Sequence, residues 1–222
     1  MRTTLKTGGV LLALVVSLAA NAEGGFQDSS GYYVGADFAW PQTRIDYREP
    51  DLPGYEISPD INGFQGGLIA GYDVQGDRYV IGFAVDAGLD TTSLGSADPN
   101  GNGYSAIDFD WHAHLRARVG YALPRDSLVF VTFGLSFAEI TIDDVDPGFG
   151  EDRAFLKGWT VGAGLERRIG DHLLLQLEYV YDDYGKGSYT LSAPSGSPFF
   201  PYYQADIDVT VRALRTTIAW HF

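Results

Sequence analysis

A strict two-residue alternation runs through the stretch DFDWHAHLRARVGY, residues 108–121. Its polar positions are Asp108, Asp110, His112, His114, Arg116 and Arg118, and the residues between them are mostly apolar. Successive side chains of a β-strand point to opposite faces, so the stretch predicts a strand with one charged and one apolar face. A soluble sheet buries the apolar face, whereas a transmembrane barrel turns it to lipid and encloses the charged face. The alternation alone leaves both arrangements open.

Eight segments of the chain alternate in this way. They cover approximately residues 31–40, 62–74, 79–89, 104–121, 127–140, 155–168, 172–182 and 206–222. Most of them reach the roughly 9 to 11 residues that a tilted strand needs to cross a bilayer. Strands of soluble proteins are usually shorter. A content of 14% aromatic residues also favours β-structure over helix.

The connections between these segments alternate in length. Three are short and rich in Gly, Pro or Asp, as tight turns require: VQGD at 74–77, ALPRDS at 122–127 and IGD at 169–171. The other four are long and cover residues 41–61, 90–103, 141–154 and 183–205. Strict alternation places every long loop at one end of an antiparallel barrel. Short periplasmic turns and long external loops are typical of outer-membrane barrels.

Glycine decides which face is enclosed. Gly71 shares the parity of Asp73, and Gly164 shares the parity of Glu166. A face open to water has no need of glycine, whereas a narrow closed interior needs it to make room for large side chains from opposite strands. The other parity holds the large apolar residues and many of the aromatic ones, among them Trp40, Trp111, Trp159, Trp220, Tyr72, Tyr121, Tyr179 and Tyr181. The sequence therefore predicts an all-β fold, an eight-stranded antiparallel up-and-down transmembrane β-barrel.

The N-terminus reads as an export signal. Arg2 and Lys6 precede an apolar run over residues 9–20, and the tripeptide ANA at 20–22 has the small residues of a cleavage site. The apolar run is too short for a spanning helix, which needs roughly 20 residues. We expect residues 1–22 to be a cleaved secretory signal peptide and residues 23–222 to be the barrel domain.

The chain is strongly acidic, with 29 Asp and Glu residues against 15 Lys and Arg residues. Loss of residues 1–22 removes two basic residues and no acidic ones, so the excess of acidic residues rises from 14 to 16. This balance argues against nucleic acid as a partner. The chain contains no Cys, so strand pairing and packing must hold an exported product without disulfides.

The last strand, TVRALRTTIAWHF, ends on an aromatic residue and carries Leu214, Ile218, Trp220 and Phe222 on one face. This pattern resembles the C-terminal signal that the outer-membrane barrel assembly machinery reads. The stretches at 67–89 and 158–185 are similar to small eight-stranded outer-membrane proteins of the opacity and outer membrane immunogenic type, which are related in architecture to the OmpA barrel domain. The resemblance implies location in the outer membrane of a diderm bacterium. Ala84 departs from the pattern, because that family would place a Glu there.

The charged face predicts a structural ion network in the lumen. Its members are Asp37, Asp73, Asp86, Asp108, Asp110, His112, His114, Arg116, Arg118, Glu166, Glu178 and Arg215. Carboxylates and guanidinium groups in a narrow interior neutralise one another, because an unpaired charge there is costly. His112 and His114 have a spacing at which two imidazoles can hold one metal ion, but the sequence fixes no third ligand. We therefore predict no metal, no cofactor and no catalytic residues.

The long loops and the residues directly beside them hold 15 acidic residues: Asp46, Glu49, Asp51, Glu56, Asp60, Asp90, Asp98, Asp143, Asp144, Asp146, Glu151, Asp152, Asp182, Asp183 and Asp206. The plain reading is solubility of exposed loops. The more specific hypothesis is that divalent cations link the loops to lipopolysaccharide or to a host surface. The expected function is a structural or surface-recognition role in the outer membrane, with outer-membrane lipid and the assembly machinery as partners. A narrow channel for small solutes is the first alternative, ahead of an outer-membrane lipid enzyme and a soluble ligand-binding barrel.

Overall fold

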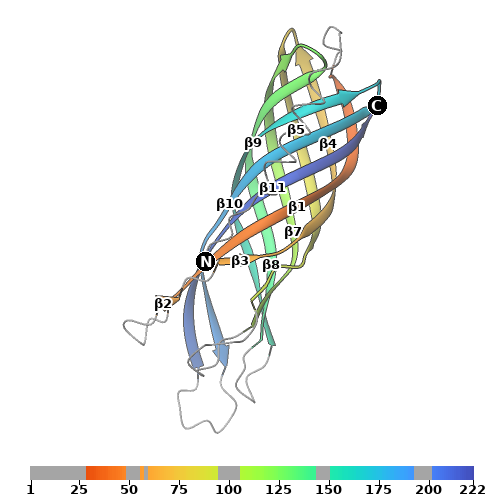
Figure 1. Ribbon diagram of the computed structural model, residues 1–222. Helices are drawn as coiled ribbons and strands as arrows, with labels where there is room; N and C mark the ends of the chain where they lie inside the picture. Colours follow the sequence, from red (N-terminus) through yellow and green to blue (C-terminus); the bar gives the residue numbers. More distant parts are fainter. Residues whose placement is uncertain (1–28, 49–55, 58–59, 95–105, 144–150, 193–201) are drawn as a thin grey trace, which may run out of the picture.

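The computed structural model describes residues 29–48, 56–57, 60–94, 106–143, 151–192 and 202–222. The expected signal peptide at 1–22 lies outside the described residues. Figure 1 shows one elongated barrel whose strands are tilted against its long axis. In the described part of the chain, no helix is long and apolar enough to cross a membrane.

Eight long strands form the wall of the barrel. They are β1 (Gly31–Arg48), β4 (Gln65–Gly76), β5 (Tyr79–Asp90), β7 (Ala106–Leu123), β8 (Ser127–Asp143), β9 (Glu151–Ile169), β10 (Leu173–Ser192) and β11 (Tyr202–His221). Each long strand pairs antiparallel with the next one along the chain, and β11 pairs with β1 to close the ring. The short strands β2 (Glu56–Ile57), β3 (Asp60–Asn62) and β6 (Ser93–Leu94) pair with β1, β1 and β7. The predicted fold class is confirmed.

The strand register fixes the tilt of the wall. Following paired residues once around the barrel leads from Pro41 on β1 back to Gly31 on the same strand, an offset of 10 residues. Closing a barrel with such an offset requires strands that tilt by roughly 35–45°. Eight strands at this tilt enclose an interior just wide enough for side chains.

The two ends of the barrel differ. Tight turns join β4 to β5, β7 to β8 and β9 to β10, and they use left-handed backbone at Asp77 (φ 54°), Arg125 (φ 66°) and Gly170 (φ 64°). Tyr33 pairs with His221, so the first and last strands also meet here. We call this the turn end, and Figure 1 places the C-terminus there. The strand ends that the four longer connections join lie at the opposite end, the loop end, as predicted.

Most of the strands extend farther toward the loop end than the alternation predicted. The segment expected at 172–182 continues to Ser192, and the one expected at 206–222 begins at Tyr202. In Figure 1 the ends of β10 and β11 project beyond the neighbouring strands. The expected loops at 41–61, 141–154 and 183–205 are therefore partly strand. The sequence missed this because the pattern of polarity changes at these positions, while the backbone pairing continues.

The middle of the wall is apolar outside and polar inside. Leu68, Ile81 and Phe133 point outward and are 71%, 63% and 56% exposed. The inward positions of the same strands are buried and include charged side chains such as Asp73 on β4 and Asp86 on β5, which are 2% and 3% exposed. Apolar side chains with no protein cover along a closed wall are typical of strands that face lipid. The charged face of the sequence alternation is thus the inner face over this part of the barrel.

Aromatic side chains mark both edges of the apolar band. Near the loop end, Trp40 packs against Phe64 with ring centroids 5.7 Å apart, and Trp159 packs against Tyr181 at 5.4 Å. Near the turn end the corresponding pairs are Tyr32 with Tyr72 at 4.6 Å and Tyr79 with Tyr121 at 5.4 Å. Such girdles lie where lipid headgroups meet the hydrocarbon region. We call the first set the loop-side girdle.

Beyond the loop-side girdle the polarity of the wall is inverted. The interior there holds an apolar group that we call the loop-end cluster: Ile45, Ile61, Ile107, Phe109, Ala138, Ile140, Leu156, Tyr184, Val209 and Val211. The outward positions of β1 at this level are Gln42, Arg44 and Asp46, all exposed. Apolar side chains inside and polar ones outside are the arrangement of a water-soluble barrel. The barrel wall therefore continues above the lipid-facing band.

A β-bulge in β7 matches this inversion. Phe109 pairs with Ile140 and Trp111 pairs with Glu139, so Asp110 is the extra residue. The bulge turns Phe109 inward, where it is 4% exposed, and turns Asp108 outward, where it is exposed. The prediction that Asp108 faces the lumen is thus wrong. The bulge reverses which positions of β7 face inward, and at the same level the interior changes from polar to apolar. The two reversals cancel in the sequence, so the alternation runs on unbroken and gives no sign of the bulge.

Candidate functional site: a charged network across the barrel interior

Strand β7 supplies the centre of the network. His112, His114, Arg116 and Arg118 follow the bulge at every second position, so all four side chains point inward. Each of them is at most 4% exposed. Two cationic guanidinium groups with this burial require carboxylates from the facing strands, because an uncompensated buried charge costs several kcal/mol, roughly 3–5.

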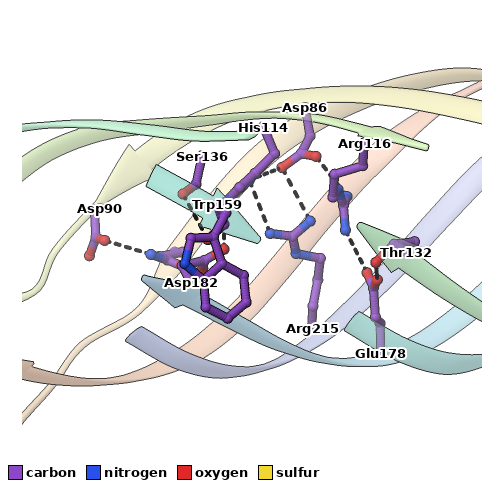
Figure 2. A network of polar contacts seen from close by, with 11 residues as sticks. Asp86, Asp90, His114, Arg116, Thr132, Ser136, Trp159, Glu178, Asp182 and Arg215 are labelled. Carbon is purple, nitrogen blue, oxygen red and sulfur yellow. Dashed lines mark hydrogen bonds and ion pairs between the residues drawn. The ribbon is translucent and has the colours of Figure 1, made fainter. Parts of the chain in front are cut away.

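Asp86 on β5 is the point where three strands meet. Its Oδ2 accepts a hydrogen bond from Arg116 at 2.6 Å, and its Oδ1 lies 3.2 Å from Arg215 Nη1 of β11. The same Oδ1 lies 2.7 Å from Nδ1 of His114. Figure 2 shows the three basic side chains converging on this carboxylate. One acidic group thus binds cationic or imidazole groups from two directions across the interior.

The second arm of Arg116 connects β7 to the far wall. Its Nη1 donates a hydrogen bond to Glu178 Oε2 on β10 at 2.8 Å. Thr132 on β8 donates to the other oxygen of Glu178 at 2.5 Å. Both oxygens of this buried carboxylate therefore have partners, and Arg116 links Asp86 to Glu178 through the interior (Figure 2).

Arg118 forms a second bridge closer to the turn end. Its Nη2 donates to Glu166 on β9 at 2.5 Å, and its Nη1 lies 3.2 Å from Asp73 on β4. Gln176 on β10 also donates to Glu166 at 2.9 Å. The guanidinium group lies over the ring of Phe130, 4.4 Å from its centroid. The buried side chain of Arg118 thus connects its own strand β7 with β4, β8 and β9.

His114 lies between two carboxylates. Its Nδ1 contacts Asp86 at 2.7 Å, and its Nε2 lies 3.3 Å from Asp182 Oδ1 on β10. Sequence analysis placed Asp182 in an acidic loop, but the structure places it inside the barrel at 4% exposure. Asp90 is a similar case, because it is 9% exposed and accepts a hydrogen bond from Gln65 at 2.6 Å. The sequence did contain a signal for this placement. Both acidic residues continue the inward parity of their strand beyond the point where its apolar outer face ends.

The remaining predicted members are less closely connected. Asp37 is 2% exposed and faces the interior, but its Oδ2 has no hydrogen-bond partner among the described atoms. Asp110 lies at the bulge, where Thr141 donates to it at 2.7 Å. Ala84 is buried with Tyr33 and Ile69 in an apolar group at the turn side of the network. The structure therefore gathers most of the predicted residues. Asp37 and His112 are buried beside the connected group, and Asp108 and Asp110 lie outside it.

His112 and His114 are neighbours in space, with ring centroids 5.6 Å apart. Among the residues that the structure describes, no group of three or more His, Asp and Glu side chains has an arrangement that holds a metal ion. The two imidazoles differ in their contacts, because His114 is paired with carboxylates, whereas Nδ1 of His112 has no hydrogen-bond partner among the described atoms.

The proposed assembly residues lie on the outer face of β11. Ile218, Trp220 and Phe222 are 48%, 50% and 69% exposed, and Leu214 has the same outward parity. Trp220 stacks on His172 with centroids 4.8 Å apart. The backbone of Phe222 donates a hydrogen bond to Tyr32 at 2.9 Å, so the last residue is joined to the first wall strand.

The barrel has a closed up-and-down topology, an apolar outer band and a charged interior. Comparison with known proteins assigns this combination to one family. Residues 8–222 match the family described as outer membrane protein beta-barrel domain. The chain belongs to this family. Its location is accordingly the outer membrane, and the curated relatives carry matching names.

Two of the relatives are named as outer-membrane immunogenic proteins. The chain is 30% identical over 174 residues to the 31 kDa outer-membrane immunogenic protein of Brucella melitensis, covering 73% of this chain and 71% of that protein. It is 33% identical over 136 residues to the 25 kDa outer-membrane immunogenic protein of Brucella abortus, covering 61% and 58%. These names describe outer-membrane antigens and no enzymes.

Solved structures show the same fold at low sequence identity. The outer membrane protein OprG of Pseudomonas aeruginosa superposes with a TM-score of 0.61 at 13% identity, covering 89% of this chain and 98% of that one. Neisserial surface protein A gives a TM-score of 0.52 at 14% identity, covering 87% and 98%. At these identities the likeness concerns the barrel architecture alone.

Proposed function

We propose that this outer-membrane barrel is a sealed anchor that presents its loop end for surface recognition, and that it has no catalytic role. The observation that carries the proposal is the bridge from Asp86 through Arg116 to Glu178, which joins β5, β7 and β10 across the interior. Side chains of opposite charge held together in this way occupy the path that a solute would take.

Two further layers support a sealed lumen. Arg118 bridges Asp73 and Glu166 on the turn side of Arg116. The loop-end cluster lies on the other side and consists of buried apolar residues. An ion that crossed the barrel would have to leave water, pass an apolar layer and then separate paired charges. Each of these steps is unfavourable in a low-dielectric interior.

Surface recognition is the second part of the proposal. The four longer connections leave the barrel at one end, on a wall that extends beyond the loop-side girdle. The relatives named as immunogenic proteins support exposure of such segments. Of the acidic residues assigned to loops, Asp90 and Asp182 lie inside the barrel, while Asp46 and Asp60 are exposed. Much of the remaining set, including 95–105 and 144–150, lies outside the described residues, and its binding to divalent cations or a host ligand stays a proposal.

Conductance in planar bilayers separates the anchor from the narrow channel. We expect the refolded wild-type protein to give no discrete conductance steps. The double variant Arg116→Ala with Glu178→Ala removes the bridge, and we expect it to admit small ions. The matched control removes the exposed pair Arg44 and Asp60, whose atoms lie 3.0 Å apart on the outer wall. Regular steps from the wild type would favour the channel and overturn the seal.

A tag-insertion experiment tests surface exposure separately. A short epitope inserted in the DPNGNG stretch, residues 98–103, should bind antibody on intact cells. The same epitope inserted at Gly170, in the turn between β9 and β10, should bind only after the outer membrane is permeabilised. The reverse pattern of labelling would contradict the orientation on which the recognition role depends.

A further inference from the structure

In the part of the chain that the structure describes, two basic side chains on the outer wall have no carboxylate within ion-pair distance. Arg212 on β11 and Lys157 on β9 are exposed, and they lie on either side of β10. The guanidinium carbon of Arg212 lies over the ring of Tyr181, 5.9 Å from its centroid. Within the described residues, neither cation forms an ion pair. In a chain with an excess of 14 acidic residues, two unpaired cations on one side of the wall need an explanation.

Two other described cations on this part of the outer wall have acidic partners. Arg44 on β1 forms two hydrogen bonds with Asp60, at 3.0 and 3.2 Å. Arg153 on β9 lies 3.8 Å from Glu139 on β8. Arg212 and Lys157 are therefore distinguished by the lack of a carboxylate, and not by exposure alone.

The height of the two cations along the barrel is specific. Arg212 pairs with Tyr181, a member of the loop-side girdle. Lys157 pairs with Phe137 and precedes Trp159 by two residues, so it projects from the same face just beyond the girdle. Aromatic girdles mark the boundary where the lipid headgroups begin. Both cations thus lie at the level of the headgroups of the outer leaflet.

One acidic residue lies between them and belongs to the same surface. Asp183 on β10 follows Tyr181 by two residues and is half-buried. Its Oδ1 accepts a hydrogen bond at 2.8 Å from the backbone of Gly185, which has left-handed φ of 64°. This carboxylate is therefore oriented by its own turn, and the surface formed by Arg212, Lys157 and Asp183 keeps one net positive charge.

We infer that Arg212 and Lys157, with Tyr181 beside Arg212, form a binding site for the phosphate group of an outer-leaflet lipid headgroup. Arg and Lys are the side chains that bind phosphate, Arg through several donors of a planar group and Lys as a point charge. The ring of Tyr181 lies under the guanidinium group of Arg212 and can hold it in place by a cation–π contact. The inference needs only the membrane location of the barrel and is independent of whether the lumen is sealed.

Native mass spectrometry of the protein released from lipid nanodiscs tests the site. The probes are lipid A carrying its phosphates and the same lipid after enzymatic removal of the phosphates. We expect the wild type to retain the phosphorylated form preferentially. Each of the variants Arg212→Gln and Lys157→Gln should lower retention about fivefold, since a basic residue near an anionic membrane surface contributes about 1 kcal/mol.

Two matched variants sharpen the result. Arg44→Gln removes a cation that already has a carboxylate partner and should leave retention unchanged. Asp183→Asn keeps the acceptor for Gly185 but removes the negative charge, so it should increase retention. Equal retention of both lipid forms by the wild type, or unchanged retention in the double variant Arg212→Gln with Lys157→Gln, would overturn the inference. Heat-modifiable gel mobility verifies that every variant is folded.

Discussion

Arg118 and Glu166 are 48 residues apart in the chain and 2.5 Å apart in the barrel interior. The contact spans from β7 to β9 and therefore passes over the intervening strand β8. The same guanidinium group also lies 3.2 Å from Asp73 on β4, so Arg118 connects strands on different sides of the barrel. Such contacts make the inward-facing charges part of the architecture.

Loss of a bridging cation should destabilise the barrel strongly. Arg116→Ala leaves Glu178 without its cation and removes one of the cations of Asp86, and breaking a buried pair in this way costs roughly 3–5 kcal/mol. Urea unfolding in lipid vesicles, followed by heat-modifiable gel mobility, measures the change. Arg44→Ala removes an exposed pair and should cost about 0–1 kcal/mol. Equal midpoints for the two variants would show that the network contributes little to stability.

A charge on the outer band should be tolerated only near its edge. Leu115 is 48% exposed and lies in the lipid-facing part of β7, so Leu115→Arg should cost roughly 2–4 kcal/mol. Gln42 lies beyond Trp40 on β1, and Gln42→Arg should cost about 0–1 kcal/mol. The measurement is the free energy of refolding into vesicles. A similar cost at both positions would contradict the assignment of the band.

An added methyl group on the inner face should be harmful where the interior is crowded. A Cβ at Gly162 would lie 2.6 Å from Thr132 Oγ1 and also against the carboxylate of Glu178. We expect Gly162→Ala to cost roughly 1–3 kcal/mol through overpacking. Gly76 has no atom within 4 Å of the corresponding position, so Gly76→Ala serves as the control. The prediction fails if thermal unfolding of the two variants coincides.

The last residue should matter for assembly in cells more than for stability. Phe222 is 69% exposed, so Phe222→Ala removes little packing within the protein. If the assembly machinery reads this side chain, the folded fraction in the outer membrane should fall several-fold, while spontaneous refolding into synthetic vesicles should be unchanged. Phe83→Ala, at a lipid-facing position with 52% exposure, is the matched control. Equal losses for the two variants in cells would point to a general effect of lipid contact.

The sequence predicted the topology because two signals agree: the two-residue alternation of polarity in the strands and the alternation of short and long connections between them. Period-two alternation identified eight strands, and the lengths of the connections assigned their ends. Glycine placement then chose the inner face, and residues such as Asp86 and Arg215 could be assigned to it before any distance was known. Their partners could not be assigned, since pairing across the interior depends on the offset of the strands around the wall.

Two features near the loop end escaped prediction for one physical reason. Asp182 looked like the start of a loop because the apolar outer face ends after Tyr181. Asp108 looked like a lumen residue because the alternation continues past it. In both places the strand leaves the lipid and enters water. Polar side chains point inward in the lipid-facing part, whereas beyond it they also cover the outer face. Sequence polarity identifies direction only where the surrounding solvent is known.

The loop-end cluster has a consequence for how this surface can vary. Its buried residues, such as Ile45 and Ile140, hold the rim of the barrel together from within, as the core of a soluble protein does. The rim therefore owes its shape to its own packing and not to the thickness or fluidity of the bilayer beneath it. Loops on such a rim can be exchanged or lengthened while the ends from which they start stay fixed. A barrel built in this way can change its exposed face without altering the part that the membrane holds.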